Sequence, residues 1–225
     1  PFGGCRVIGL RLTGFGPSVY TRVVRMALAE KGLEYEFEDV NPFSEEGRVA
    51  MQRLHPMSRV PVLEHYAFKI YETAAILGYL DDVFEDAQLM PRGAKARARV
   101  RQVLGLVDCY GYWPMVRQVF SHGVFRPRLG EEANADEIKQ GLAASVPVLD
   151  ALEEIAAGGL VLNGRDMTRA DCHLGPMIDY FLMQSDGAEM LAERPALTAW
   201  FGAISQRPAF LATRPNLPVA SESIA

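Results

Sequence analysis

Hydrophobic positions in the first forty residues change period twice, and their order predicts strand, helix, strand. Arg6 to Thr13 is rich in Val, Ile and Leu, which predicts a buried strand that ends at the loop 14–17. From Val19 to Lys31 the apolar residues recur with the spacing of one helical face, and Gly32 follows as a C-terminal stop. Glu34 to Val40 alternates polar and apolar residues, the pattern of a strand with one wet face.

The next stretch, Val60 to Leu80, predicts two short strands and a helix. Proline cannot donate to a sheet ladder, so Pro61 suggests a strand entered through a tight turn, with a cis bond as one option. A second strand follows at Phe68, and Glu72-Thr73 precedes a run with helical spacing. Asn41 to Arg53, before this stretch, leaves room for a short helix. The whole order is that of a thioredoxin-like mixed sheet flanked by helices.

No strand pattern follows Leu80, and the second half of the chain predicts an all-α domain. An acidic and then proline-containing linker, Asp81 to Gly93, separates two domains that we expect at 1–86 and 92–225. A capping box is expected at Thr168-Arg169-Ala170-Asp171. We expect Phe120 to Asn134 to be a surface loop. The predicted helices are Ala94 to Val119 with a kink at Pro114, Ala135 to Ala157 with a kink at Pro147, Thr168 to about Met183, and about Pro195 to Ser205, after which Arg207 to Phe210 ends the regular pattern.

Composition and charge exclude several classes of protein. The formal net charge of −5 argues against non-specific nucleic-acid binding, which needs a basic stripe. Cys5, Cys109 and Cys172 form no CxxC, so we expect neither a disulfide framework nor a metal site, and a reducing, cytoplasmic setting fits best. No segment has about 18 uninterrupted apolar residues, and 1–6 lacks a signal-peptide pattern, so we expect no membrane span and no export signal.

The residues around Pro61 and Glu72 suit an α-amino acid head group. A helix that starts at Thr73, as N-cap or first-turn residue, offers N–H groups and a hydroxyl to an anion. The adjacent Glu72 can hold an ammonium group. A proline-led strand entry leaves the backbone N–H and C=O of Val60 available to an extended ligand. These groups together predict a small peptide-like ligand.

Arg59-Val60-Pro61-Val62-Leu63 and Glu72-Thr73 resemble the matching motifs of the soluble glutathione transferases. Leu162 to Asp171 resembles the glycine turn and helix cap of the helical domain of that family, and the likeness spans about Val7 to Phe210. It is closest to serine-type members of the bacterial, phi and theta-like kind. The resemblance implies an α/β thioredoxin-like N-terminal domain, an all-α C-terminal domain, and a detoxifying transferase with glutathione as co-substrate and no cofactor.

The resemblance also implies roles for individual residues. Ser18 matches the serine that donates a hydrogen bond to the thiol sulfur of glutathione. Ser18 as a mere helix cap is the alternative, and Thr13, Tyr20 and Thr21 are the other nearby hydroxyls. Thiol reductase activity is disfavoured because the cysteine-type members carry Cys at this position. The glutathione-binding set is Arg59, Val60, Pro61, Glu72 and Thr73, with Arg48 as a second candidate for the glycyl carboxylate.

An apolar electrophile would meet the first long helix of the second domain, at Tyr110, Trp113, Val116 and Arg117. Aromatic residues at helical spacing also suit a core. The four histidines are isolated from one another in the sequence. We interpret the adjacent Cys172 and His173 as packing residues rather than metal ligands. The resemblance implies a cytoplasmic homodimer that binds glutathione and a small apolar electrophile, with no nucleic acid and no membrane partner. Glutathione-dependent isomerisation or dehalogenation, and a non-catalytic interaction module, remain open as alternatives.

Overall fold

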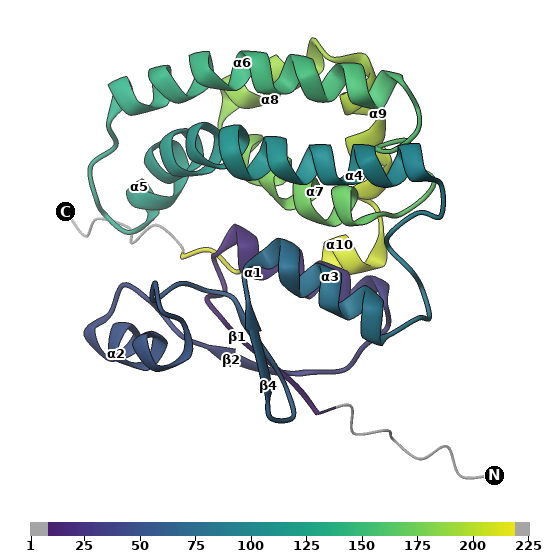
Figure 1. Ribbon diagram of the computed structural model, residues 1–225. Coiled ribbons are helices and arrows are strands. Elements are labelled where there is room, and N and C mark those ends of the chain that lie inside the picture. The colour runs from purple at the N-terminus through teal and green to yellow at the C-terminus, as the bar shows by residue number, and fades with distance from the viewer. Residues whose placement is uncertain (1–8, 219–225) are drawn as a thin grey trace. The chain divides into compact units, whose positions relative to one another are not determined.

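The computed structural model describes residues 9–218, which divide between Ala87 and Gln88 into two compact units (Figure 1). The first unit holds every strand of the described part, and the second holds helices alone. The two-part fold expected from the sequence, a thioredoxin-like unit followed by an all-helical unit, is therefore confirmed. The start of the first predicted strand, Arg6 to Ile8, and Cys5 lie outside the described residues.

A mixed sheet of four strands forms the centre of the first unit. Its spatial order is β2-β1-β3-β4, with β1 parallel to β2 and antiparallel to β3, and with β3 and β4 paired as a hairpin. Thr13 in β1 pairs with Val62 in β3, which in turn pairs with Tyr71 in β4. The strands are β1 Leu10–Gly14, β2 Glu36–Asp39, β3 Val62–His65 and β4 Phe68–Tyr71.

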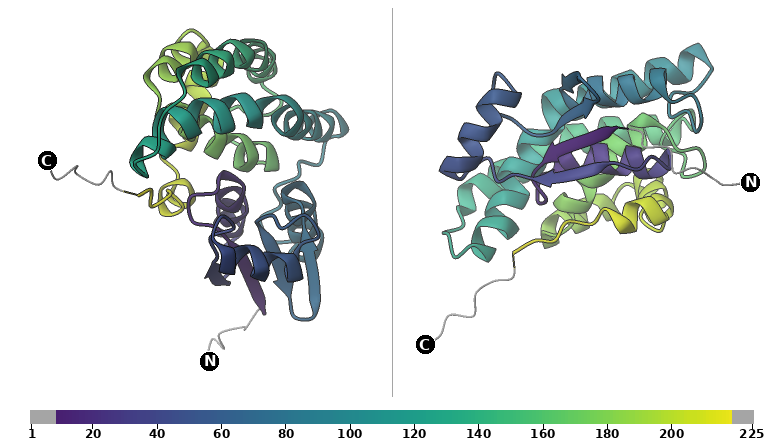
Figure 2. Two further views of the ribbon diagram at one scale, coloured as in Figure 1. Left: turned by 90° about the vertical axis from the view of Figure 1, so that its left-hand side faces the viewer. Right: turned by 90° about the horizontal axis from the view of Figure 1, so that it is seen from below.

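Two of the three helices of this unit pack against each other. α1 (Val19–Glu30) and α3 (Thr73–Val83) run side by side, while α2 (Glu45–Leu54) lies apart from them (Figures 1 and 2). The apolar face predicted for α1 is fully buried, and Gly32 follows the helix with a φ of +64°. α2 begins at Ser44, whose Oγ accepts the N–H of Gly47 at 3.1 Å.

Strand β2 differs from its prediction. All four of its residues are exposed, so the expected buried face is absent there. β2 is an edge strand, and its apolar residue Phe37 keeps 37% of its surface exposed. The guanidinium of Arg25 lies over the Phe37 ring, 5.0 Å from its centroid, which partly covers it.

A buried ion pair joins α1, α3 and the segment that follows them. The ammonium of Lys31 donates to Asp81 Oδ1 at 2.9 Å and to the carbonyl oxygens of Asp86 and Ala87 at 3.2 and 3.1 Å. The side chains of Lys31 and Asp81 are 0% and 1% exposed. Because carbonyl oxygens complete its set of acceptors, this charge is buried with its hydrogen bonds satisfied.

The second unit starts with one long helical segment that changes its hydrogen-bonding pattern. α4 (Ala94–Leu106) continues into two π-helical segments, η1 (Val107–Gly111) and η2 (Trp113–Phe125), and then into the short α5 (Arg126–Arg128). The predicted loop at 120–134 is therefore wrong up to Arg128. Pro127 is accommodated as the second residue of α5.

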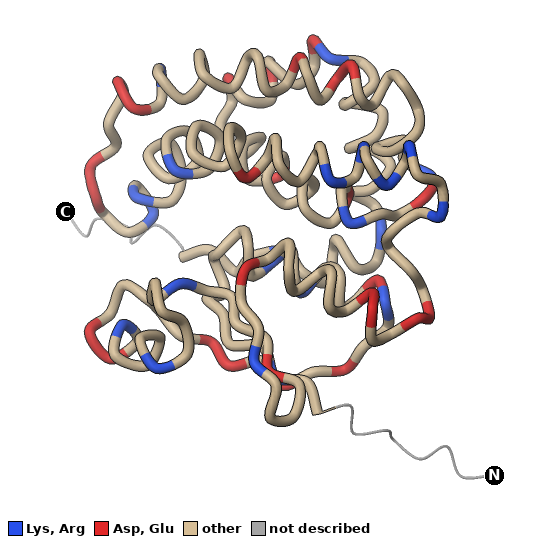
Figure 3. The backbone as a smooth tube through the Cα atoms, in the orientation of Figure 1, with Lys and Arg blue, Asp and Glu red and all other residues tan. Residues whose placement is uncertain are grey.

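The remaining helices of the second unit are α6 Ala135–Ala157, α7 Arg169–Phe181, α8 Ser185–Ala192, α9 Pro195–Ile204 and α10 Pro208–Ala212. α6, α7 and α9 match predicted helices, whereas α8 was not predicted and α10 replaces the expected end of regular structure. Basic residues gather over the first turns of α4 (Figure 3), where Lys95, Arg97, Arg99 and Arg101 are exposed.

The predicted capping box connects two helices of the second unit. Oδ2 of the fully buried Asp171 accepts the backbone N–H of Thr168 at 2.8 Å and its hydroxyl at 2.5 Å. Oδ1 accepts the indole N–H of Trp200, on α9, at 2.6 Å. Burial raises the pKa of Asp171, while these donors act to lower it. One carboxyl group therefore both starts α7 and fixes it to α9.

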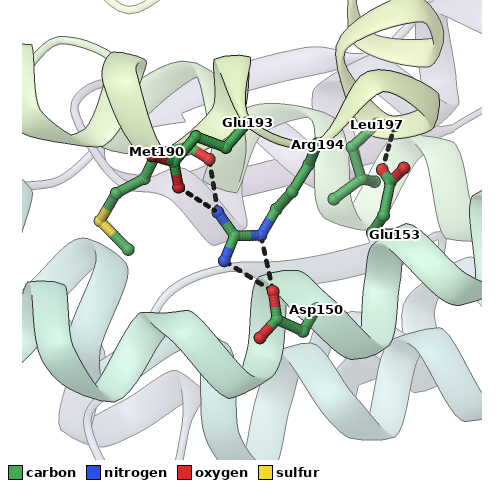
Figure 4. Close-up of polar contacts among 6 residues, drawn as sticks. All are labelled: Asp150, Glu153, Met190, Glu193, Arg194 and Leu197. Carbon is green, nitrogen blue, oxygen red and sulfur yellow. Dashed lines mark hydrogen bonds and ion pairs between the residues drawn. The ribbon is translucent and has the colours of Figure 1, made fainter.

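A second polar cluster fixes the start of α9 to α6 (Figure 4). The guanidinium of Arg194 donates twice to Asp150 Oδ1, at 3.0 and 2.6 Å, and once to the carbonyl oxygen of Met190. One turn further along α6, Glu153 accepts the N–H groups of Ala196 and Leu197. These first amides of α9 have no partner inside their own helix, so a carboxylate from α6 serves as its cap.

Replacement of Asp171 by Ala should lower the free energy of unfolding by about 3 kcal/mol, because it leaves buried donors of Thr168 and Trp200 without an acceptor. Urea unfolding followed by circular dichroism measures the loss. Thr168→Ser keeps the capping hydroxyl and should stay within about 1 kcal/mol of the parent. Equal stabilities for Asp171→Ala and the parent would contradict this role.

Candidate functional site

The sheet brings the predicted ligand-binding segments to one end. The C-terminal end of β1, the N-terminal end of β3 and the C-terminal end of β4 are neighbours, because Thr13, Val62 and Tyr71 form one row across the ladder. Adjacent strands lie about 4.8 Å apart, so this row is only about 10 Å wide. Ser18 follows β1, Val60 precedes β3 and Glu72 follows β4. The residues predicted for glutathione binding therefore start from the same edge.

The loop between β1 and α1 is held by acceptors from its surroundings. The N–H of Phe15 donates to Thr21 Oγ1 at 3.2 Å, and the N–H of Gly16 donates to Asp39 Oδ1 at 2.9 Å. The N–H of Ser18 closes the turn by donating to the carbonyl oxygen of Phe15 at 2.8 Å. These three backbone hydrogen bonds fix the conformation of the loop and therefore the position of Ser18.

Ser18 is the N-cap of α1, and this role leaves its proton available. Its Oγ accepts the backbone N–H of Thr21 at 3.3 Å, with an extended backbone of φ −71° and ψ 125°. A hydroxyl that accepts one hydrogen bond still has an O–H to donate. The side chain is half-buried, so a ligand can reach it. Helix capping and donation to a sulfur atom are therefore compatible roles for Ser18.

Two of the other hydroxyls near the loop belong to buried threonines. Thr13 Oγ1 donates to Glu38 Oε2 at 3.3 Å, and Thr21 Oγ1 accepts from Phe15, and both threonines are fully buried. Tyr20 is half-buried on α1. Ser18 and Tyr20 are both partly exposed, and of these two residues Ser18 is the one that caps the helix.

The entry to β3 has the geometry that its proline suggests. The Val60-Pro61 peptide bond is cis, and pairing of β3 with both neighbours begins at Val62. Val60 therefore lies just outside the ladder, and its backbone groups extend the row beyond the last paired residue. Arg59 is exposed beside it, and Arg48 is exposed on α2.

Glu72 occupies an unusual backbone conformation. It is the N-cap residue of α3 with φ +69° and ψ 115°, and its side chain makes no capping hydrogen bond. A positive φ costs a non-glycine residue of order 1 kcal/mol or more and tends to occur at functional sites. The carboxylate is 71% exposed, whereas the next residue, Thr73, is 7% exposed and begins the helix. The backbone thus turns Glu72 outward at the helix start.

His55, which read as isolated in the sequence, contacts this end of the sheet. Its side chain is 3% exposed, its ring centroid lies 4.4 Å from that of Tyr71, and its Nε2 lies 3.6 Å from Glu72 Oε1. Its Nδ1 accepts the N–H of Met57 at 2.9 Å. The sequence carries no local signal for this contact, because only the strand pairing brings residues 55 and 72 together.

The residues predicted for the electrophile belong to the second unit. Tyr110 and Trp113 are 64% and 61% exposed, and Arg117 is exposed. Val116 is only 7% exposed, so its side chain serves the core of the helices. His173, predicted as a packing residue, is fully buried, but its Nε2 also lies 2.7 Å from Asp108 Oδ1, within hydrogen-bond distance.

Residues 9–218 contain neither a cluster of metal-binding side chains nor a helix that could span a membrane. No group of three or more His, Cys, Asp or Glu side chains in that range is arranged to hold a metal ion. None of the helices in the same range combines the length and apolar character needed to cross a bilayer.

Comparisons with known proteins agree on one family. The family models described as "Glutathione S-transferase, N-terminal domain" and "Glutathione S-transferase, C-terminal domain" match residues 12–88 and 112–208. The chain is similar to glutathione S-transferase F13 of Arabidopsis thaliana, with 28% identity over 95% of this chain and 98% of the relative.

Solved structures of similar proteins include two from organisms as distant as a poplar and a bacterium. Glutathione transferase F7 from Populus trichocarpa has a TM-score of 0.79 and 26% identity, over 91% of this chain and 97% of that one. A glutathione S-transferase from Rhodospirillum rubrum F11 has a TM-score of 0.74 and 27% identity, over 92% and 96% of the two chains.

Proposed function

Because the chain belongs to the glutathione S-transferase family, we propose that its first unit binds glutathione and that Ser18 keeps the bound thiol anionic. The protein is a glutathione transferase with glutathione as co-substrate. The observation that carries the proposed site is the strand pairing, which places the segments with Ser18, Val60 and Glu72 at the same edge of the sheet. The classification as a serine-type enzyme of the bacterial, phi or theta-like kind is part of the same proposal.

Each part of the tripeptide has a complementary group at this edge. The γ-glutamyl ammonium meets the exposed carboxylate of Glu72, and the γ-glutamyl carboxylate meets the hydroxyl and first amides at Thr73. The cysteinyl backbone pairs with Val60 beside Pro61, where the ladder ends. The glycyl carboxylate meets a guanidinium, for which exposed Arg59 is the first candidate and Arg48 the second.

The reaction depends on the charge of the sulfur. A free thiol with a pKa of about 8.5 is mostly protonated at neutral pH, and only the thiolate is a good nucleophile. A hydrogen bond from Ser18 Oγ and the N-terminal end of α1 stabilise the anion, and one unit of pKa lowering corresponds to about 1.4 kcal/mol. The thiol proton leaves to solvent. The thiolate then forms a carbon–sulfur bond to an electrophile such as an aryl halide, the carbon–halogen bond breaks and halide leaves to solvent, and Ser18 itself stays protonated.

The second unit supplies the electrophile site in this proposal. Tyr110 and Trp113 offer exposed aromatic surface that suits an apolar compound, and Arg117 can face a developing negative charge. Buried Val116 supports the helix rather than the ligand. Homodimerisation and a cytoplasmic location complete the proposal. Cys109 and Cys172 carry reduced thiols, as a reducing compartment would favour.

Retention on immobilised glutathione, followed by elution with free glutathione, tests the proposed binding site. Glutathione consumption with a panel of aryl halides, peroxides and maleyl acids then tests the chemistry. Conjugation of aryl halides is the expected result. Turnover of maleyl acids alone would indicate an isomerase, and retention without any turnover would indicate an interaction module. A chain that is not retained and does not turn over would refute the proposal.

Ser18→Ala should lower turnover at near-neutral pH by about tenfold, because the loss of the donor raises the pKa of the bound thiol by roughly one unit. The pH dependence of kcat and the ultraviolet absorbance of bound thiolate measure this change. The glutathione KM should change little. Ser18→Thr keeps a hydroxyl and serves as the matched control, and a parental kcat in Ser18→Ala would assign thiol activation to another group.

Thr73→Val should weaken glutathione binding by about fivefold, because a hydroxyl donor to the γ-glutamyl carboxylate is replaced by a methyl group. Titration calorimetry gives the dissociation constant directly. Thr73→Ser retains the hydroxyl and should bind as the parent does. An unaltered affinity in Thr73→Val would remove Thr73 from the site.

A further inference from the structure

His55 lies where two separate segments of the proposed site meet. It follows α2, and its own N–H donates to the carbonyl oxygen of Met51 at 2.8 Å. The ring contacts Met57, which lies in the turn before Val60, and Glu72, which stands at the start of α3. Val60 and Glu72 are the residues assigned above to different parts of glutathione. One imidazole therefore contacts both of the segments that carry these proposed glutathione-binding residues.

The hydrogen bond from Met57 fixes the tautomer of this ring. A backbone N–H donates only to a nitrogen that has a free lone pair, so Nδ1 carries no hydrogen and Nε2 carries one. The Nε2–H lies on the side of Glu72 Oε1, at 3.6 Å between the heavy atoms. The neutral ring therefore accepts a hydrogen bond from one segment and has its second nitrogen close to the carboxylate of the other, just beyond hydrogen-bond distance.

We propose that His55 is a positioning residue of the glutathione site, which joins the Met57 turn to the Glu72 carboxylate through its two ring nitrogens. The inference rests on the proposed function, since Glu72 and Val60 are assigned there. His55 acts through these groups and needs no contact with the tripeptide. The hydrogen bond from Met57 holds the turn that precedes Val60, and the Nε2–H attracts the Glu72 carboxylate, whose side chain is 71% exposed.

Protonation of the ring disrupts this arrangement in two ways. A proton on Nδ1 removes the acceptor of the Met57 N–H, and the imidazolium competes with the γ-glutamyl ammonium for Glu72. The titratable side chains of the described residues that face the ring are Tyr71 on β4, Glu72 at the start of α3 and Arg59 before β3. Proton binding at His55 and ligand binding at Glu72 therefore oppose each other.

Burial lowers the pKa of His55 from its ordinary value of 6.5, the Glu72 carboxylate acts in the opposite direction, and the Arg59 guanidinium adds to the lowering. The ring is consequently neutral at neutral pH and becomes charged only below about pH 6.5. Affinity for the ligand should be full above this range and fall as the pH drops through the lowered pKa. The carboxylates and the ammonium of the tripeptide keep their charges over that window.

Calorimetric binding of S-methylglutathione tests the inference, because this probe has the full tripeptide but no thiol to titrate. His55→Asn keeps a side-chain acceptor for the N–H two residues on, as in an Asx turn, but is too short to reach Glu72. We expect about threefold weaker binding at neutral pH, in line with an exposed charged contact. The dissociation constant of the parent should rise by about threefold between pH 7 and pH 5, and that of the variant should stay nearly flat.

The matched control is His65→Asn, which removes another ring of the same unit. His65 Nδ1 lies 2.7 Å from the hydroxyl of Tyr79, at the opposite end of β3 from Val62. This variant should keep the parental affinity and the parental pH slope. Equal affinity and equal slope in His55→Asn and the parent would overturn the positioning role. A parent chain that does not bind S-methylglutathione at all would refute the proposed function instead.

A second measurement needs no variant and remains decisive if His55→Asn does not fold. Linkage requires that a ligand weakened by His55 protonation should itself lower the pKa of His55. Nuclear magnetic resonance of the parent, with labelled histidine, should show the hydrogen on Nε2 and a pKa that falls when S-methylglutathione is added. A hydrogen on Nδ1, or a pKa that the ligand leaves unchanged, would contradict the inference.

Discussion

The register of the antiparallel strands is the constraint on which the rest of the site depends. Thr13, Val62 and Tyr71 stand in one row, so the segments that follow β1, precede β3 and follow β4 must all leave the sheet at the same edge. A slip of one residue would turn every side chain of a strand to the opposite face. The fully buried Leu12 and Leu63, which pair directly, make such a slip costly. Core packing therefore fixes the geometry of a polar edge.

Hydrogen bonds to neighbouring elements also fix the loops that follow or precede the paired strands. The N–H groups of Phe15 and Gly16 donate to side chains of α1 and β2, and the N–H of Met57 donates to His55. Loop backbone near a ligand has to place its donors without help from a regular element. Here acceptors from neighbouring elements do so, and in the proposed site the proton of the Ser18 hydroxyl, whose oxygen caps α1, and the Val60 backbone serve the ligand.

The sequence predicts the parts of this arrangement whose causes are local. Helix α1, the proline-led entry to β3 and the cap at Thr168 each depend on neighbours within a few residues, and the structure has all three. The contact of His55 with Glu72 and that of Gly16 with Asp39 join residues far apart in the chain, so no local sequence pattern predicts them. The same limit explains why the predicted loop at 120–134 is wrong up to Arg128, because η2 packs there against α6 and α7, which lie later in the chain.

Charge at the helix ends explains why this edge suits an anionic peptide. α2, α6, α7 and α8 each carry an acidic residue in the first turn, and α9 receives the carboxylate of Glu153 instead, so these positive ends are already neutralised. α1 and α3 carry no acid in the first turn, and both begin at the shared edge. Glu72 stands just before α3 with a positive φ and no capping bond, which turns its charge outward. Within the first unit, α1 and α3 are therefore the described helices whose positive ends lack an acid, and they match the two anionic groups of the proposed site, a thiolate at Ser18 and a carboxylate at Thr73. In the same proposal Glu72 faces the ammonium beside that carboxylate.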